Sequence, residues 1–187
     1  MDFYERKKRQ LEKNDKSNIG EIDKPILKLV NLINSKQEFY TTSSCAGRIT
    51  LLKDMEKKQE GLFLFRTHDK INFSELKKEL IKARSYKKLI YFKQEPAIIH
   101  IACKNLENAQ KLIDNAKFVG FKKSGIIASS NRIVIELLST ENIILPIIDR
   151  GKILVSDEFL KLLISEANKK LERTRKKINK LYSLVKR

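Results

Sequence analysis

Short segments typical of β-strands recur between residues 39 and 138, and only two segments with helical spacing interrupt them. β-Branched and apolar residues predict strands over 39–42, 49–52, 61–65, 89–92, 97–103, 124–128 and 132–138. Capping residues and apolar spacing predict helices that begin at Asp23, Asn72 and Asn105. Because strands and helices do not alternate strictly, the pattern predicts an α+β fold of mixed sheet layers with packed helices.

The C-terminal residues predict the longest element. Ser156 is a candidate N-cap, and apolar residues follow at 4-3 spacing to Val185, with Thr174 in the one gap. We therefore expect an α+β body over 1–155 and a long basic helix over 156–187, with the first half of this helix packed on the body. The same spacing leaves a coiled-coil seam between copies open, so the oligomeric state is undetermined.

The charge balance indicates a polyanionic partner. The chain has 187 residues with 40 Lys and Arg against 23 Asp and Glu, a formal charge of +17. Nucleic acid and membrane surfaces are the polyanions that attract such a protein, and a charge-rich thermophilic surface is the alternative. Ten Lys and Arg against two Glu lie within 160–187, so this helix is expected to supply nonspecific affinity for such a polyanion.

Several classes of protein are disfavoured. No apolar run approaches the ~20 residues of a membrane span, and the first residues lack the apolar part of a signal peptide, so a cytoplasmic protein is expected. Two cysteines and two histidines make neither a disulfide framework nor a zinc site, and we expect no metal. The glycine-rich nucleotide fingerprints are missing.

The segment Ser43-Ser44-Cys45-Ala46-Gly47-Arg48 is the first candidate site. Small residues let backbone N–H groups approach an anion, and the arginine adds a forked cation. The alternative is a tight turn in which Thr42 and the two serines satisfy their own backbone.

Further candidates lie outside this segment. His100 occupies an apolar strand, on the face opposite Ile99 and Ile101, and is either a satisfied core histidine or a site group on a sheet face. His68 follows a strand, where loops often carry function. Cys45 is a nucleophile or a structural thiol.

Six motifs occur in order along residues 1–172. They are Asp15-x-Ser17-x-x-Gly20-x-Ile22-Asp23, Tyr40-Thr41-Thr42-Ser43-Ser44-Cys45-Ala46-Gly47-Arg48-Ile49, His68, Glu95-Pro96-Ala97-Ile98-Ile99-His100-Ile101, Gly120-Phe121-x-x-Ser124-Gly125-Ile126 and Glu166-Ala167-Asn168-x-x-Leu171. Together they resemble the tRNA wybutosine-synthesising protein 3 family, whose members often have Ser at the position of Ala46.

The resemblance implies an S-adenosylmethionine-dependent methyltransferase that methylates N4 of the wyosine-type base at position 37 of phenylalanine tRNA, on a fold other than the Rossmann methyltransferase. It implies that the anticodon loop of this tRNA is the partner. The alternatives are a noncatalytic tRNA-binding module, which would bind no cofactor, and a Cys45-dependent hydrolase, which thiol alkylation would inactivate.

The resemblance and the residue types together give an expected site. The expected catalytic residues are His100, as base or base-orienter, then His68, Ser44 and Cys45. The expected cofactor-binding residues are Thr42, Ser43, Ser44, Gly47, Arg48, Ser124 and Gly125. The expected substrate-binding residues are Asp15, Ser17, Asp23, Arg48, Asn168, Lys169, Arg173 and Lys176.

Overall fold

The chain forms two compact units, the first assembled from three stretches of sequence and the second from two. A computed structural model describes residues 2–12, 22–54 and 61–187. Unit 1 comprises residues 1–46, 97–140 and 174–187, and unit 2 comprises residues 47–96 and 141–173. Residues 1–155, expected as one body, therefore contribute to both units.

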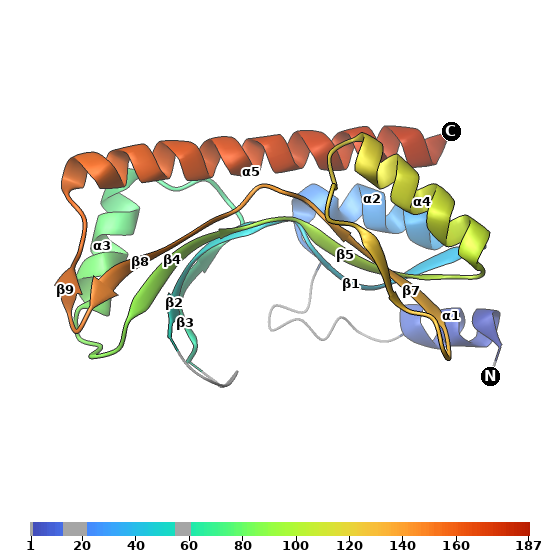
Figure 1. The fold of residues 1–187 in the computed structure, drawn as a ribbon, viewed down its shortest axis with the longest axis horizontal. Coiled ribbons are helices and arrows are strands. Elements are labelled where there is room, and N and C mark those ends of the chain that lie inside the picture. The colour runs from blue at the N-terminus through green and yellow to red at the C-terminus, as the bar shows by residue number, and fades with distance from the viewer. Residues whose placement is uncertain (1, 13–21, 55–60) are drawn as a thin grey trace. The chain divides into compact units, whose positions relative to one another are not determined.

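Unit 1 is built on a four-stranded antiparallel sheet in the order β1 (Phe39–Cys45), β5 (Ile98–Cys103), β7 (Ile133–Leu138), β6 (Gly125–Ala128). The helices α2 (Lys24–Ser35) and α4 (Leu106–Phe118) cover one face of it (Figure 1). The end of α5 (Asp157–Lys186) adds Ile178, Leu181 and Val185 to the same core. Burying the apolar face of each of these elements gives unit 1 its core.

The helix α1 (Phe3–Leu11) contacts the other face of this sheet. The ring of Phe3 lies 5.3 Å from that of the buried Tyr40, and Asp2 and Glu5 form a complete capping box. The polar residues of α1 were not predicted to form a helix. None of the residues of α1 is buried, so this segment lacks the spaced apolar residues that predict a helix packed on a core.

Unit 2 is built on a five-stranded antiparallel sheet in the order β3 (Phe63–Thr67), β2 (Arg48–Lys53), β4 (Ile90–Glu95), β8 (Ile143–Asp149), β9 (Lys152–Ile153). The helix α3 (Phe73–Ala83) and the first half of α5 share its core with apolar residues of β2, β4 and β8. On α5 these core residues are Leu160, Leu163, Ile164, Ala167 and Leu171.

The predicted α+β class and most predicted elements are confirmed. Asn72 and Glu75 form the predicted capping box, Asn105 caps α4, and the Ser156 hydroxyl accepts from the Phe159 N–H at 3.2 Å. The strands β8 and β9 were not predicted. Pro146 within β8 weakens its strand signal, and β9 has only two residues. No helix in the described part of the chain is long and apolar enough to cross a membrane.

Candidate active site

One residue from each strand of unit 1 contributes to a row that crosses the sheet. Ser43 on β1 is paired with His100 on β5, His100 with Glu136 on β7, and Glu136 with Gly125 on β6. Residues directly opposite one another in antiparallel strands point to the same face. Ile99 and Ile101 beside His100 are fully buried in the core, so this polar row lies on the face away from α2 and α4.

Hydrogen bonds connect three members of the polar row. The Ser43 Oγ lies 2.9 Å from His100 Nδ1, and His100 Nε2 lies 2.8 Å from Glu136 Oε2. A carboxylate only accepts, so Nε2 carries the hydrogen, and the Nδ1 of a neutral ring then accepts from the Ser43 hydroxyl. The His100 and Glu136 side chains are 30% and 26% exposed, so a bound molecule can reach them.

A β-bulge places Ser43 in this row. The register of β1 against β5 shifts between Thr41 and Ser43, which leaves Thr42 as the extra residue, and its hydroxyl donates to the His100 carbonyl at 3.3 Å. Without the bulge, Thr42 would lie opposite His100. Bulges re-aim side chains in this way, often beside active sites.

Beyond the bulge, regular strand alternation puts the next two residues on opposite faces. Ser44 is paired with the buried Ile99, so it lies on the face covered by helices. Cys45 is paired with Ile98 and shares the face of the polar row. Of the two expected catalytic residues at 44 and 45, only the cysteine therefore lies on the side of His100.

Gly125 and Ser124, both expected to bind the cofactor, have different surroundings. A Cβ on Gly125 would meet nothing within 4 Å, so the glycine leaves space beside Glu136 that the fold does not use. Ser124 is buried, where its hydroxyl donates to the Phe121 carbonyl at 2.7 Å and accepts from the Leu138 N–H at 3.2 Å. Ser124 thus ties the entry of β6 to β7.

Asp23 holds the end of β1. It occupies the predicted N-cap position of α2, although its side chain makes no capping hydrogen bond. Its carboxylate instead accepts from the Ala46 N–H at 2.8 Å. The Asp23 carboxylate therefore stabilises the residue that follows β1 and not the first turn of α2.

In unit 2, His68 is oriented by the backbone. Its Nδ1 lies 3.0 Å from the Gly47 carbonyl oxygen, which only accepts, so the hydrogen of a neutral ring is at Nδ1 and Nε2 is the basic nitrogen. Gly47 has a φ of 87°, a left-handed conformation that favours glycine. The direction of the carbonyl that orients His68 therefore depends on a backbone conformation that favours glycine.

Arg48 is held by partners within unit 2. It forms an ion pair with Glu95, its register partner on β4, and its guanidinium lies 4.8 Å from the centre of the Phe63 ring. The Arg48 side chain remains 25% exposed. An anionic ligand would meet a cation that is already positioned.

Most of the expected substrate-binding residues on α5 have roles in the fold. Asn168 accepts from the Ile71 N–H at 3.1 Å and donates to the Ile71 carbonyl at 2.8 Å. Lys169 pairs with Glu166 at 2.8 Å, and Arg173 lies 3.8 Å from Glu141. Lys176 is exposed. Asp15 and Ser17 lie outside the described residues.

Cys103 is unsuited to nucleophilic chemistry. It is buried in unit 1, and burial raises the pKa of its thiol to about 12, so it stays protonated at neutral pH.

Glu136 was not among the predicted site residues. A signal for it was present, since Glu136 is the one charged residue of the apolar strand β7, as His100 is the one polar residue of β5. The order hydroxyl, imidazole and carboxylate suits either activation of a nucleophile or removal of a proton from a substrate.

The comparisons with known proteins separate these chemistries. The model of the family described as Methyltransferase TYW3 matches residues 5–187. A relative from Archaeoglobus fulgidus, named tRNA(Phe) 7-((3-amino-3-carboxypropyl)-4-demethylwyosine(37)-N(4))-methyltransferase, is 38% identical, over 88% of this chain and 83% of its own. The mouse tRNA wybutosine-synthesizing protein 3 homolog is 33% identical, over 98% of this chain and 73% of its own.

The fold has solved relatives. The PH1069 protein from Pyrococcus horikoshii is similar with a TM-score of 0.90 and 29% identity, over 99% of this chain and 94% of that one. A hypothetical protein from Aeropyrum pernix is similar with a TM-score of 0.76 and 30% identity, over 87% of this chain and 96% of that one. A methyltransferase requires a methyl donor. By the match over nearly its whole length, this chain belongs to the TYW3 methyltransferase family.

Proposed function

We propose that this protein transfers a methyl group from S-adenosylmethionine to N4 of the demethylwyosine-type base at position 37 of phenylalanine tRNA. The observation that carries the proposal is the family match over residues 5–187, because relatives at 38% and 37% identity are named for this reaction. The match disfavours the noncatalytic tRNA-binding module.

The residues present fit such a methyl donor. Its amino acid end carries a carboxylate, and its ribose carries hydroxyl groups. In unit 1, Glu136 offers a partly exposed acceptor for these hydroxyl groups. The open space over Gly125 admits a ligand without displacing any side chain. Thr42 and Ser43 remain proposed cofactor contacts in unit 1, whereas Ser44 lies on the opposite face of the sheet from Ser43. Gly47 and Arg48 remain separate proposals within unit 2.

The polar row supplies a path for the proton of the substrate. When bound, S-adenosylmethionine would supply an electrophilic methyl group, and its sulfonium sulfur would depart as a neutral thioether as the new nitrogen–carbon bond forms. The nitrogen must then lose its hydrogen as a proton. We propose that Ser43 Oγ accepts this proton while its own passes to His100 Nδ1, over the 2.9 Å contact.

Glu136 stabilises the product of that transfer. When His100 gains the proton, the ring becomes a cation, and the carboxylate at 2.8 Å from Nε2 offsets its charge. The same contact holds the ring at the orientation in which Nδ1 faces Ser43. His68, whose basic atom is Nε2, is the second candidate for the base.

The substrate is a polyanion, in keeping with the formal charge of +17. We propose that the anticodon loop presents the splayed base at position 37, that basic residues of α5 add nonspecific affinity, and that the protein acts in the cytoplasm.

The experiment is a methyl-transfer assay with the purified chain. Labelled S-adenosylmethionine is incubated with phenylalanine tRNA that carries the demethylated precursor, and the nucleosides are separated and weighed by mass spectrometry. We expect a mass gain of one methyl group on the wyosine-type nucleoside. A matched tRNA with an unmodified guanosine at position 37 should gain none.

The same assay separates the alternatives. Binding of the precursor tRNA with no cofactor binding and no transfer would favour the noncatalytic module and contradict the proposal. Methylation of the guanosine tRNA alone would show a methyltransferase with a different acceptor.

A further inference from the structure

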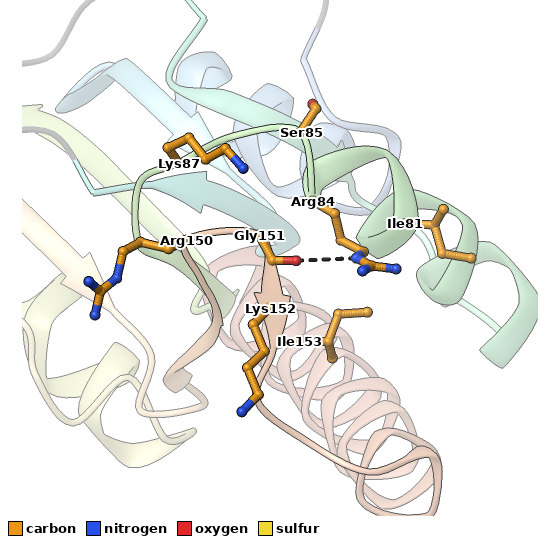
Figure 2. A pocket seen from close by; sticks show the side chains of 8 residues that line it. All are labelled: Ile81, Arg84, Ser85, Lys87, Arg150, Gly151, Lys152 and Ile153. Carbon is orange, nitrogen blue, oxygen red and sulfur yellow. Dashed lines mark hydrogen bonds between the residues drawn. The ribbon is translucent and has the colours of Figure 1, made fainter.

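A second basic feature lies in unit 2 (Figure 2). An open pocket of about 730 Å³ lies between the end of α3 and the turn that joins β8 to β9. Arg84 and Lys87 line it from the α3 side, Arg150 and Lys152 from the turn, and Ile81 and Ile153 form apolar walls.

The charge around this basic pocket is almost all of one sign. Residues 84–88 and 149–152 include five Lys and Arg and a single carboxylate, Asp149, which lies 3.4 Å from Arg150 Nε. Within the described residues, the side chains of Lys87 and Lys152 have neither a hydrogen-bond nor an ion-pair partner. Cations gathered without anions repel one another, and a bound anion would relieve this repulsion.

The cations are not needed to cap α3. Lysines and arginines are common at helix C-termini because they pair with the last carbonyls. Here the carbonyls of Ile81, Lys82 and Ala83 accept from the N–H groups of the three residues that follow the helix. Helix capping therefore leaves Lys87 and Lys152 unexplained.

The two sides of the basic pocket are fixed to each other. Arg84 Nε donates to the Gly151 carbonyl at 3.2 Å, as the dashed line in Figure 2 shows. Gly151 has a φ of 82°, and a Cβ there would lie 2.6 Å from the Arg84 carbonyl oxygen. The close approach of these two backbones sets the spacing of the cations.

We propose that the basic pocket binds phosphodiester groups of the RNA substrate. The identity of that RNA rests on the proposed function. Exposed lysines and arginines that neutralise phosphates gain the free energy of counterion release. Tyr86, in the same loop, is 40% exposed, and Lys53 Nζ lies 4.2 Å from the centre of its ring. The exposed aromatic ring offers a surface on which a base can stack.

The register of unit 2 places this contact apart from Arg48. Ile90 at one end of β4 pairs with Ile148 beside the basic pocket, and Glu95 at the other end pairs with Arg48. At ~3.4 Å per residue these ends are roughly 17 Å apart. One nucleotide does not span that distance, whereas a stretch of RNA backbone does, so the basic pocket would contact nucleotides other than the one near Arg48.

The test measures the salt dependence of tRNA binding. The variant Lys87→Ala/Lys152→Ala and the wild-type chain are titrated with an unmodified phenylalanine tRNA transcript at several KCl concentrations. We expect the magnitude of the slope of log K against log[KCl] to decrease by about 1.4 to 1.8 in the double alanine variant, because each lost phosphate contact removes about 0.7 to 0.9. Lys87→Arg/Lys152→Arg should restore the slope.

The matched control is Lys28→Ala/Lys111→Ala, which removes the same charge from exposed positions of α2 and α4. An equal fall in slope for both double alanine variants would overturn the proposal, since only net charge would then matter. An unchanged slope in the Lys87/Lys152 variant would also overturn it, even if inorganic phosphate binds the wild-type chain.

Methyl transfer by the wild-type chain is measured in parallel. A reduced slope in the pocket variant without wild-type methylation would refute the proposed reaction and leave the RNA contact standing. Methylation by the wild-type chain with an unchanged slope in the pocket variant would support the proposed reaction and refute the RNA contact.

Discussion

The polar row of unit 1 and the basic pocket of unit 2 use charged residues in different ways. Ser43, His100 and Glu136 lie on paired strands, and each has a side-chain partner at 2.9 Å or less. Lys87 lies in a loop, Lys152 lies in a two-residue edge strand, and neither side chain has a partner among the described residues. Proton transfer needs fixed geometry, whereas attraction to phosphate falls off slowly with distance. In the proposed roles, strand register therefore serves proton transfer, and loops suffice for affinity for RNA.

The largest expected effect concerns the polar row. His100→Asn keeps a polar side chain on β5 but cannot take up a proton, so we expect kcat to fall by about 10² to 10⁴. His68→Asn is the matched variant, and we expect a smaller loss from it. Single-turnover methyl transfer measures both. Near-normal kcat in folded His100→Asn would remove the histidine from the mechanism, and a larger loss in His68→Asn would transfer the role of base to unit 2.

Alanine substitutions at Gly151 of the basic pocket and Gly125 of the polar row compare how far the stability of the fold depends on each glycine. Gly151→Ala puts a Cβ 2.6 Å from a backbone oxygen at a left-handed φ, so we expect a loss of about 1–3 kcal/mol. Gly125→Ala meets nothing within 4 Å, and we expect a change below about 0.5 kcal/mol. Urea unfolding of both variants gives the comparison. Equal losses would mean that the space over Gly125 is needed by the fold.

The same Gly125→Ala variant tests whether that space holds a ligand. An added methyl group in a ligand site costs about 1–3 kcal/mol, so we expect the KM for S-adenosylmethionine to rise about tenfold. Steady-state kinetics at saturating tRNA measures it. A normal KM in the stable variant would place the cofactor away from β6.

The smallest expected effect concerns α5. The hydrogen bond from Lys169, followed by its charge, lowers the pKa of Glu166 from its ordinary 4.5. A lowered folded pKa gives stability that is present above the unfolded pKa and is lost as pH falls through the folded value. Lys169→Ala should raise this pKa and weaken the pH dependence, as carboxyl NMR titration would show. An unchanged pKa would mean that Lys169 is available to RNA.

Local sequence signals predicted most elements but few contacts of the site. Caps at Asn72, Asn105 and Ser156 depend on residues three positions away, so the sequence shows them directly. Asp23 matched the same rule, yet its carboxylate accepts from Ala46. A capping preference is worth about 1 kcal/mol, which a tertiary hydrogen bond can outweigh.

By itself, the sequence determined the α+β class, the long C-terminal helix and the family, because these depend on local patterns and ordered motifs. Only the tertiary structure joined His100 to Glu136, 36 residues away, and Arg84 to Gly151, 67 residues away. Strand pairing and a one-residue bulge decide which side chains share a face. That choice minimises the free energy of the whole packed sheet, so no single segment reveals it.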